Sequence, residues 1–464
     1  MTAARGLLDS ARRIAPLAWP VFVGQVAVLG FSTVDTVMVA RYSAVDLAAL
    51  AVGAAAYITI FVGFMGVVLA IGPIAGQLFG ARKTMEAGAQ LHQAIWVALG
   101  LAVLGSALLL MPGPFLYAAQ AKPEVAEKVR AYLGFLAIAL PPSLIFQTFR
   151  GFNTAVSRPK VVMVLQLVGL ALKIPLNALF IYGMPAWNVP AMGAAGCGLA
   201  SAIAMWVQLL IAWWVLRRDP FYAPFGLQHV TRLNPPDWKS LKELLRLGLP
   251  MGMSILIEVT GFTFMAIFIS RIGATEVAGH QLAANLVSLM FMMPLAIANA
   301  TTTLVAQSIG ADQHADARRL GWHGLKIGAV VATLLGTTVY LLREPVLGAY
   351  TNNPVIIASA MPLLAFVALF HVADATQTIA SFVMRAYRVA TAPMVIYAVA
   401  LWGVGLGGGY VIAFNVTGLT PDFLLGAQGF WSASVTGLVL SGIGLCVLMA
   451  WVLRHRSGHE TSRF

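Results

Sequence analysis

Long apolar segments, separated by short polar ones, make up most of this chain. They recur along the whole sequence, are rich in Leu, Ala, Val and Gly, and each reaches the roughly twenty residues that a helix needs to cross a bilayer. They lack the apolar–polar alternation of membrane β-barrel strands. The pattern predicts an all-α integral membrane protein with twelve transmembrane helices, over residues 14–40, 47–78, 91–116, 131–149, 161–182, 193–216, 244–270, 276–308, 322–342, 355–384, 390–414 and 425–453.

Composition supports this prediction. Of the 464 residues, 59% are hydrophobic and 10% are charged, and the mean hydropathy is +0.84. A surface of this kind suits lipid rather than water. The first apolar segment is too long for a signal peptide and lacks an A-x-A cleavage site, so we expect it to remain as a span. Cys197 and Cys446 fall inside predicted spans, which indicates packing residues rather than a disulfide or a metal site.

The basic residues predict which loops face the cytoplasm. If the spans alternate and both termini are cytoplasmic, the cytoplasmic segments hold 22 of the 29 Lys and Arg residues and the external loops hold 6. Cytoplasmic loops of membrane proteins carry such an excess of positive charge. The net charge of +12 therefore reflects topology, and we expect no nucleic-acid partner.

An internal repeat divides the chain into two similar halves. A shift of 230 residues superposes Pro20 on Pro250 and Arg41 on Arg271, without a gap over about sixty residues. Each half holds six predicted spans, so the halves have the same orientation and are related by a pseudo-two-fold axis along the membrane normal. The predicted parts are an N-terminal six-helix lobe, a cytoplasmic linker and a C-terminal six-helix lobe, over residues 1–216, 217–242 and 243–464.

Four charged residues lie well inside predicted spans, away from the span ends: Asp35, Lys173, Glu258 and Asp374. A carboxylate at the centre of a span costs roughly 2.5–3.5 kcal/mol, and such residues mark ion or substrate paths. Three carboxylates cannot all pair with one lysine. The acids also fail to superpose under the repeat shift, which indicates that the lobes do different jobs. Lys173 either approaches Asp35 or extends its stem toward the membrane surface.

The tenth predicted span carries a polar stripe. Gln377, Thr378 and Ser381 follow Asp374 at helical spacing, and His371 precedes it by one turn. A polar stripe inside a membrane needs water, a partner or an ion. Because the ordinary pKa of histidine lies close to neutrality, His371 is also a candidate proton relay beside Asp374.

Glu258 and Asp374 are predicted to reach a similar depth in the membrane, where they can meet. Two adjacent carboxylates must either share a proton or bind a cation between them. Carboxylate and amide oxygens are hard ligands that suit Na⁺, so Gln281, Asn285, Thr378 or water are candidates to complete a sodium shell around the two acids.

Several segments together resemble one known family. These are the run LAWPVFVGQVAVLGFSTVDTVMVARYSAVDLAALAVG, the block GPIAGQLFGAR, the segment IPLNALFIYG followed by GAAGCGLASAIAMW, and the block HVADATQTIASFVMRAYR. They are similar to the multidrug and toxic compound extrusion (MATE) family, in its NorM-like bacterial branch. The resemblance covers essentially the full chain. It implies a twelve-helix, two-lobed antiporter of the bacterial inner membrane that expels lipophilic, mostly cationic drugs in exchange for Na⁺ or H⁺.

The resemblance also implies roles for particular residues. Asp35, Glu258 and Asp374 match acidic positions of the branch, and Asn177 matches its helix-five asparagine. Asp35 with Asn177 is then the substrate and proton site, because a carboxylate that binds either a proton or a cationic drug couples the two fluxes. The chain departs from the branch at Phe370, where a tyrosine is common, and this weakens a sodium assignment.

Two other classes of function would show different sequence features. A lipid-linked precursor flippase of the same superfamily would more often show extra spans and a cationic cavity. An intramembrane enzyme would need converging catalytic pairs, and His371 beside Asp374 is the sole candidate in the sequence. The sequence lacks a P-loop, an HExxH motif and a nucleophile elbow, so we expect a secondary transporter without a cofactor. We expect a monomer that contacts its drugs and membrane lipids.

Overall fold

The computed structural model describes residues 6–120, 122–228 and 232–455. Within these ranges every named secondary-structure element is a helix. Both chain ends lie outside the described residues. The first half contains α1 (Leu7–Tyr42), α2 (Ala44–Val68), α3 (Ile71–Gly80), α4 (Thr84–Leu110), α5 (Gly113–Ala118), α6 (Pro123–Ala155), α7 (Pro159–Tyr182), η1 (Pro185–Trp187), α8 (Ala194–Arg218) and η2 (Pro220–Phe225). The second half contains α9 (Trp238–Ser270), α10 (Ala274–Gly310), α11 (His314–Leu341), α12 (Arg343–Tyr350), α13 (Pro354–Ala360), α14 (Leu363–Ala386), α15 (Thr391–Tyr397), η3 (Ala398–Gly408), α16 (Gly409–Ala413), η4 (Asp422–Leu424) and α17 (Ala427–His455).

Twelve of the helical segments in the described residues are long and apolar enough to cross a membrane. Two of them combine shorter elements, because α2 and α3 form the segment Ala44–Gly80 and α15, η3 and α16 form Thr391–Ala413. Each of the twelve overlaps one predicted span. The prediction of a polytopic all-α membrane protein is confirmed.

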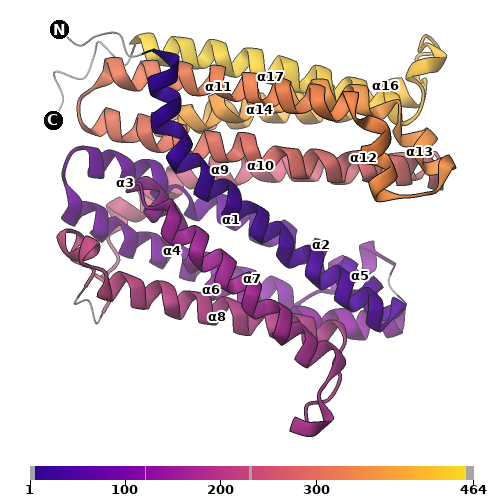
Figure 1. Cartoon of the computed structure of the whole chain (residues 1–464), viewed down its shortest axis with the longest axis horizontal. Helices are drawn as coiled ribbons and strands as arrows, with labels where there is room; N and C mark the ends of the chain where they lie inside the picture. Colours follow the sequence, from indigo (N-terminus) through magenta and orange to yellow (C-terminus); the bar gives the residue numbers. More distant parts are fainter. Residues whose placement is uncertain (1–5, 121, 229–231, 456–464) are drawn as a thin grey trace. The chain divides into compact units, whose positions relative to one another are not determined.

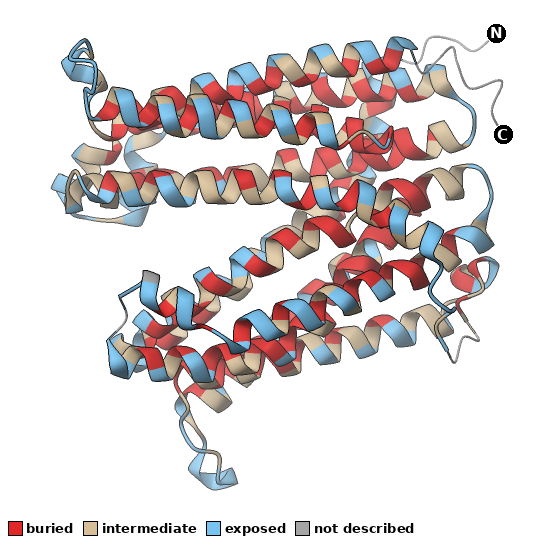
Figure 2. Cartoon of the chain, turned by 180° about the vertical axis from the view of Figure 1, so that it is seen from behind, coloured by how far each residue is buried: buried red, intermediate tan, exposed pale blue. Residues whose placement is uncertain are grey.

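The chain forms two compact units, an N-terminal unit of Val23–Gly252 and a C-terminal unit of Met1–Phe22 with Met253–Phe464. In the N-terminal unit, α6 packs against α2, α4 and α8. In the C-terminal unit, α14 packs against α10, α11 and α17, and Figure 1 shows these helices running side by side. Buried positions concentrate where the helices of each unit meet (Figure 2).

The borders of the units fall inside α1 and α9 rather than in the linker, unlike the expected division at residues 216 and 243. The two borders, after Phe22 and after Gly252, are 230 residues apart and therefore equivalent in the repeat. Each follows an intrahelical proline, Pro20 or Pro250. Proline removes a backbone hydrogen bond and disturbs the helix around it. The first part of α1 therefore belongs to the C-terminal unit, and the first part of α9 belongs to the N-terminal unit.

Specific contacts hold these helix segments in their units. In the C-terminal unit, Arg13 of α1 forms an ion pair with Asp316 of α11 at 2.9 Å. In the N-terminal unit, Gly248 of α9 packs so closely on α2 that an added Cβ would lie 2.4 Å from the carbonyl oxygen of Val67. A larger residue at position 248 would therefore force the two helices apart.

The connection between α8 and α9 is bound to the N-terminal unit, although residues 229–231 of the predicted linker lie outside the described residues. Asp219 forms an ion pair with Arg158 at 2.7 Å, and the Tyr222 hydroxyl donates to Asn153 Oδ1. The side chain of Gln93 donates to the carbonyl of Pro235 at 2.9 Å. These bonds make the described part of the linker an ordered segment of the N-terminal unit.

The glycine-rich run GVGLGG lies within η3, an eleven-residue π-helix. It packs on α17, where a Cβ on Gly437 would lie 2.5 Å from the carbonyl oxygen of Ala400. Trp402 of the same segment donates its indole N–H to the carbonyl of Ile257 in α9 at 3.0 Å. π-Helical segments occur often at functional sites, and η3 stands directly beside Glu258, the residue that follows Ile257.

Candidate functional site

Asp35 of α1 lies at the centre of a polar cluster in the N-terminal unit. One carboxylate oxygen, Oδ2, is 2.9 Å from the ammonium of Lys173, and the other, Oδ1, accepts a hydrogen bond from Asn177 Nδ2 at 2.7 Å. Lys173 and Asn177 are four residues apart on α7, so they occupy the same helix face one turn apart. The cluster therefore satisfies both oxygens of the carboxylate.

Lys173 turns into the protein rather than toward the membrane surface. It is 2% exposed, donates a hydrogen bond to the Ser201 hydroxyl of α8, and stands 5.6 Å from the ring centre of Phe31. Asp35 is 9% exposed. The buried ion pair gives the N-terminal cluster a net charge of zero.

The C-terminal unit holds the second cluster. Asp374 of α14 is 3% exposed, and its Oδ1 accepts a hydrogen bond from Gln377 Nε2 at 3.1 Å. Glu258 of α9 is half-buried and lies close enough for its charge to act on Asp374. The structure thus brings Glu258 and Asp374 together, as their similar predicted depth in the membrane suggested.

Two residues of this cluster were missed by the sequence reasoning. Arg385 of α14 is buried over the ring of Phe382, and its charge acts on Glu258. Tyr397 of α15 is buried, is hydrogen-bonded to Ser381 and lies within electrostatic reach of both acids. A shift of 235 residues superposes Arg150 on Arg385, and this match between the two halves is a sequence signal that points to the arginine.

Several polar atoms beside Asp374 are buried without a hydrogen-bond partner in the described part of the chain. These include both ring nitrogens of His371, Oε1 of Gln377 and Oγ of Ser441 on α17. Thr378 is 3% exposed on the same helix. An unpartnered buried polar group is costly, so each of these atoms can bind a water or an ion, and the ring of His371 can also bind a proton. The predicted polar stripe is therefore buried and retains free donors and acceptors.

Gln281 and Asn285 are not brought to the acids. Helix α10 buries residues such as Leu286 and Met290, whereas Gln281 and Asn285 are exposed. Asn285 Oδ1 instead accepts a hydrogen bond from the hydroxyl of Tyr350 at 3.0 Å. The face of α10 that carries these amides points away from the core that contains Asp374.

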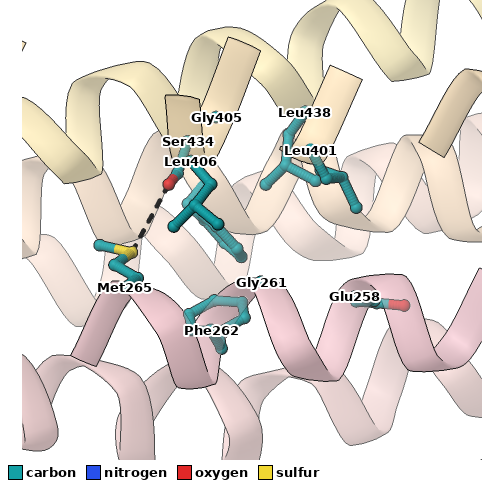
Figure 3. Close-up of a pocket in the computed structure, with 10 residues that line it drawn as sticks. Glu258, Gly261, Phe262, Met265, Leu401, Gly405, Leu406, Ser434 and Leu438 are labelled. Carbon is teal, nitrogen blue, oxygen red and sulfur yellow. Dashed lines mark hydrogen bonds between the residues drawn. The ribbon is translucent and has the colours of Figure 1, made fainter. Parts of the chain in front are cut away.

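An apolar pocket adjoins Glu258 within the C-terminal unit. Glu258 lies at one end, and Met265 with Ser434 at the other, where the Ser434 hydroxyl contacts the Met265 sulfur at 3.6 Å (Figure 3). Phe370, at the position where the family often has tyrosine, packs edge-on against Phe262 with ring centres 5.4 Å apart. The pocket is lined by Glu258, Gly261, Phe262, Met265, Phe370, Leu401, Gly405, Leu406, Ser434 and Leu438.

A carboxylate beside an apolar wall can bind a proton, Na⁺ or an organic cation, since each neutralises the buried charge. Among the described residues no group of three or more His, Cys, Asp or Glu side chains is arranged to hold a metal ion.

Known proteins resemble this chain in both halves of its repeat. The family model MatE matches residues 20–179 and 250–411, one match in each half of the repeat. The chain is 38% identical over 447 residues to a probable multidrug resistance protein NorM of Aromatoleum aromaticum, covering 96% of this chain and 94% of that protein. It is 34% identical over 448 residues to the multidrug resistance protein MdtK of Photorhabdus laumondii, covering 96% of each.

Solved structures show the same fold at low sequence identity. The crystal structure of the eukaryotic MATE transporter AtDTX14 superposes with a TM-score of 0.85 at 17% identity, covering 98% of this chain and all of that one. An outward-facing multidrug resistance MATE family transporter gives 0.84 at 20% identity, covering 98% of both chains. Together with the family match and the full-length relatives, this shows that the chain belongs to the MatE family, in its NorM-like branch.

Proposed function

We propose that this chain is a secondary antiporter that exports lipophilic, mostly cationic compounds in exchange for H⁺ or Na⁺ by alternating access. Family membership supports a transporter, and the names of its relatives support drug export. The observation that carries the proposal is the charge of the C-terminal cluster, where two acids, Glu258 and Asp374, have one neighbouring cation, Arg385, whose charge acts on Glu258. One negative charge is left for a proton or Na⁺ to neutralise.

The two clusters have separate tasks in this proposal. Asp35 and Asn177 bind the cationic group of the drug, while Glu258 and Asp374 bind the coupling ion. A buried carboxylate pair cannot keep two charges without compensation, so the C-terminal cluster takes up an ion in each cycle. His371 passes protons to and from Asp374, which it precedes by one helical turn.

A proton gradient alone is sufficient to drive export, and Na⁺ stimulates it. Sodium prefers several oxygen ligands, and the acids supply up to four. Tyr397 and Thr378 add hydroxyls beside them, so the hydroxyl missing at Phe370 is available from another helix.

A lipid-linked precursor flippase is less well supported. Such a protein needs a cationic cavity for a pyrophosphate group. Lys173 is the one lysine that lies well inside a predicted span, away from its ends, and the carboxylate of Asp35 already neutralises it. The charged residue that lines the apolar pocket, Glu258, is an acid and not the cation that a pyrophosphate group needs.

The experiment is dye export from proteoliposomes that contain the purified full-length protein. A labelled lipophilic cation such as ethidium is followed while a pH gradient and a Na⁺ gradient are imposed separately. The expected result is export with the pH gradient alone and faster export with Na⁺ added. Export that requires Na⁺ at equal pH on both sides would refute proton coupling, and export with neither gradient would refute antiport.

Orientation is the last element of the proposal. We place both termini and the linker in the cytoplasm of a bacterial inner membrane, with the protein acting as a monomer. The linker holds the densest basic charge of the chain, and positive loops stay inside. Ser240→Cys in intact cells should react with membrane-permeant thiol reagents only; reaction with an impermeant reagent would reverse the topology.

A further inference from the structure

The ion pair between Asp35 and Lys173 raises a problem for cation binding. The ammonium already occupies Oδ2 of the carboxylate at 2.9 Å, and Asn177 occupies Oδ1 at 2.7 Å. Both charged side chains are at least nine-tenths buried as residues. A cationic drug that binds Asp35 therefore competes with the ammonium of Lys173 for one negative charge.

The surroundings of the pair offer the ammonium no second acid. Lys173 also contacts the hydroxyl of Ser201, and in the described part of the chain neither Asp35 nor Lys173 has a second ion-pair partner. The titratable groups that face the pair are a thiol on α8 and a phenol on α6, both neutral at neutral pH. These are Cys197 and Tyr132.

A displaced ammonium would leave the cluster with two positive charges and one negative charge. An uncompensated charge in an apolar interior is strongly unfavourable. A lysine can remove it by giving up a proton and remaining as a neutral amine, whereas an arginine cannot. The geometry thus links entry of a cation to loss of a proton from the same cluster.

We propose that the Nζ atom of Lys173 is the proton carrier of the N-terminal cluster, which rests on the proposed antiport function. When a monovalent organic cation reaches Asp35, one N–H bond of the ammonium breaks, its electron pair stays on Nζ, and the proton passes to water. The net charge of the cluster is zero before and after. On the other side of the membrane a proton from water binds the amine, and the restored ammonium displaces the cation.

This exchange has a fixed stoichiometry and pH dependence. One proton leaves for each monovalent cation that binds, so affinity should rise about tenfold per pH unit wherever Lys173 is protonated in the free state and neutral in the bound state. In this proposal the proton leaves Nζ of Lys173, and the carboxylate of Asp35 stays as the anion that binds the cation. The substrate class is therefore a lipophilic monovalent cation that competes with an ammonium.

The test counts protons released during binding of tetraphenylphosphonium to purified full-length protein in a weakly buffered solution. Glu258→Gln with Asp374→Asn is the parent, so that the C-terminal cluster contributes no protons. The parent should release about one proton per bound cation. Lys173→Arg keeps the ion pair but cannot deprotonate, and should release none while binding falls at least tenfold. A proton release in Lys173→Arg equal to that of the parent would overturn the proposal.

A second variant keeps the test decisive if Lys173→Arg does not fold. In Lys173→Met, Asp35 remains as the one charged group of the cluster, so the pH dependence of binding should move to the acidic range typical of a carboxyl group. An unchanged pH profile would overturn the proposal. Lys160→Arg and Lys160→Met, at an exposed position on the same helix, are the matched controls and should behave as the parent.

Failure of this inference is distinguishable from failure of the proposed function. Wild-type protein that exports no ethidium under any gradient contradicts the antiporter itself. Wild-type protein that exports normally, while Lys173→Arg in the parent background still releases one proton per cation, contradicts only the role of Lys173.

Discussion

The two units bury acids of the same kind in different electrical settings. In the N-terminal unit Asp35 faces one lysine at 2.9 Å and the cluster is neutral. In the C-terminal unit Glu258 acts on Asp374 and lies within electrostatic reach of Arg385, so two acids have one neighbouring cation. The comparison teaches that the partner of a buried acid, more than the acid itself, decides what it can bind. A neutral pair exchanges one cation for another, whereas an excess carboxylate must take up a cation.

The largest effect should come from removing the excess charge. Glu258→Gln and Asp374→Asn should each reduce gradient-driven ethidium export in proteoliposomes to the level of protein-free vesicles, because the C-terminal cluster then holds no charge for a coupling ion to neutralise. Glu344→Gln and Asp422→Asn make the same chemical changes at exposed sites and should leave export unchanged. Normal export by Glu258→Gln or Asp374→Asn would contradict the proposed difference between the two units.

A smaller effect is expected from a change in the neutral cluster around Asp35. Asn177→Ala removes the hydrogen bond to Asp35 Oδ1, and a hydrogen bond to a charged group contributes roughly 1.5–3 kcal/mol. The affinity for tetraphenylphosphonium should therefore fall roughly ten- to a hundredfold. Asn352→Ala, at an exposed position, is the control. Unchanged affinity in Asn177→Ala would show that the drug does not use this carboxylate.

His371→Gln should affect only the rate of proton-driven export. The glutamine keeps polarity near Asp374 but cannot carry a proton, so proton-driven export should slow roughly tenfold, within the range of proton-transfer catalysis, while drug affinity is unchanged. His314→Gln, at the start of α11, is the control. Full-rate export by His371→Gln would mean that protons reach Asp374 by another route.

Tyr397→Phe should have the smallest effect. It removes a hydroxyl beside both acids, and a hydrogen bond contributes about 0.5–1.5 kcal/mol. The Na⁺ concentration that half-maximally stimulates export should rise roughly two- to tenfold. Tyr410→Phe, at an exposed position, should leave it unchanged. An unaltered Na⁺ response in Tyr397→Phe would separate this hydroxyl from the ion site.

The fold could be predicted from the sequence because it depends on local apolar segments and on an internal repeat. A span needs a long apolar segment, and the repeat showed that the two halves share one design. The borders of the units were not predictable in the same way. They fall after Pro20 and Pro250, inside continuous helices, and depend on which neighbours each helix segment packs against.

The site followed from the sequence only in part. Helical spacing placed Gln377 beside Asp374 and Asn177 beside Lys173, because those relations lie within one helix. Spacing does not say which neighbouring helix a residue faces. Asn285 therefore turned out to bond Tyr350 instead of an acid, and Tyr397, from a different helix, went unnoticed.

The division of labour between the units is tested most directly by measuring tetraphenylphosphonium binding and proton-driven export on the same preparations of Asp35→Asn and Asp374→Asn. Asp35→Asn should lose both, because no carboxylate remains to bind the drug. Asp374→Asn should bind the drug with wild-type affinity and yet fail to export it, because the coupling ion has lost its site. Loss of binding in Asp374→Asn as complete as in Asp35→Asn, or wild-type binding in Asp35→Asn, would contradict the account.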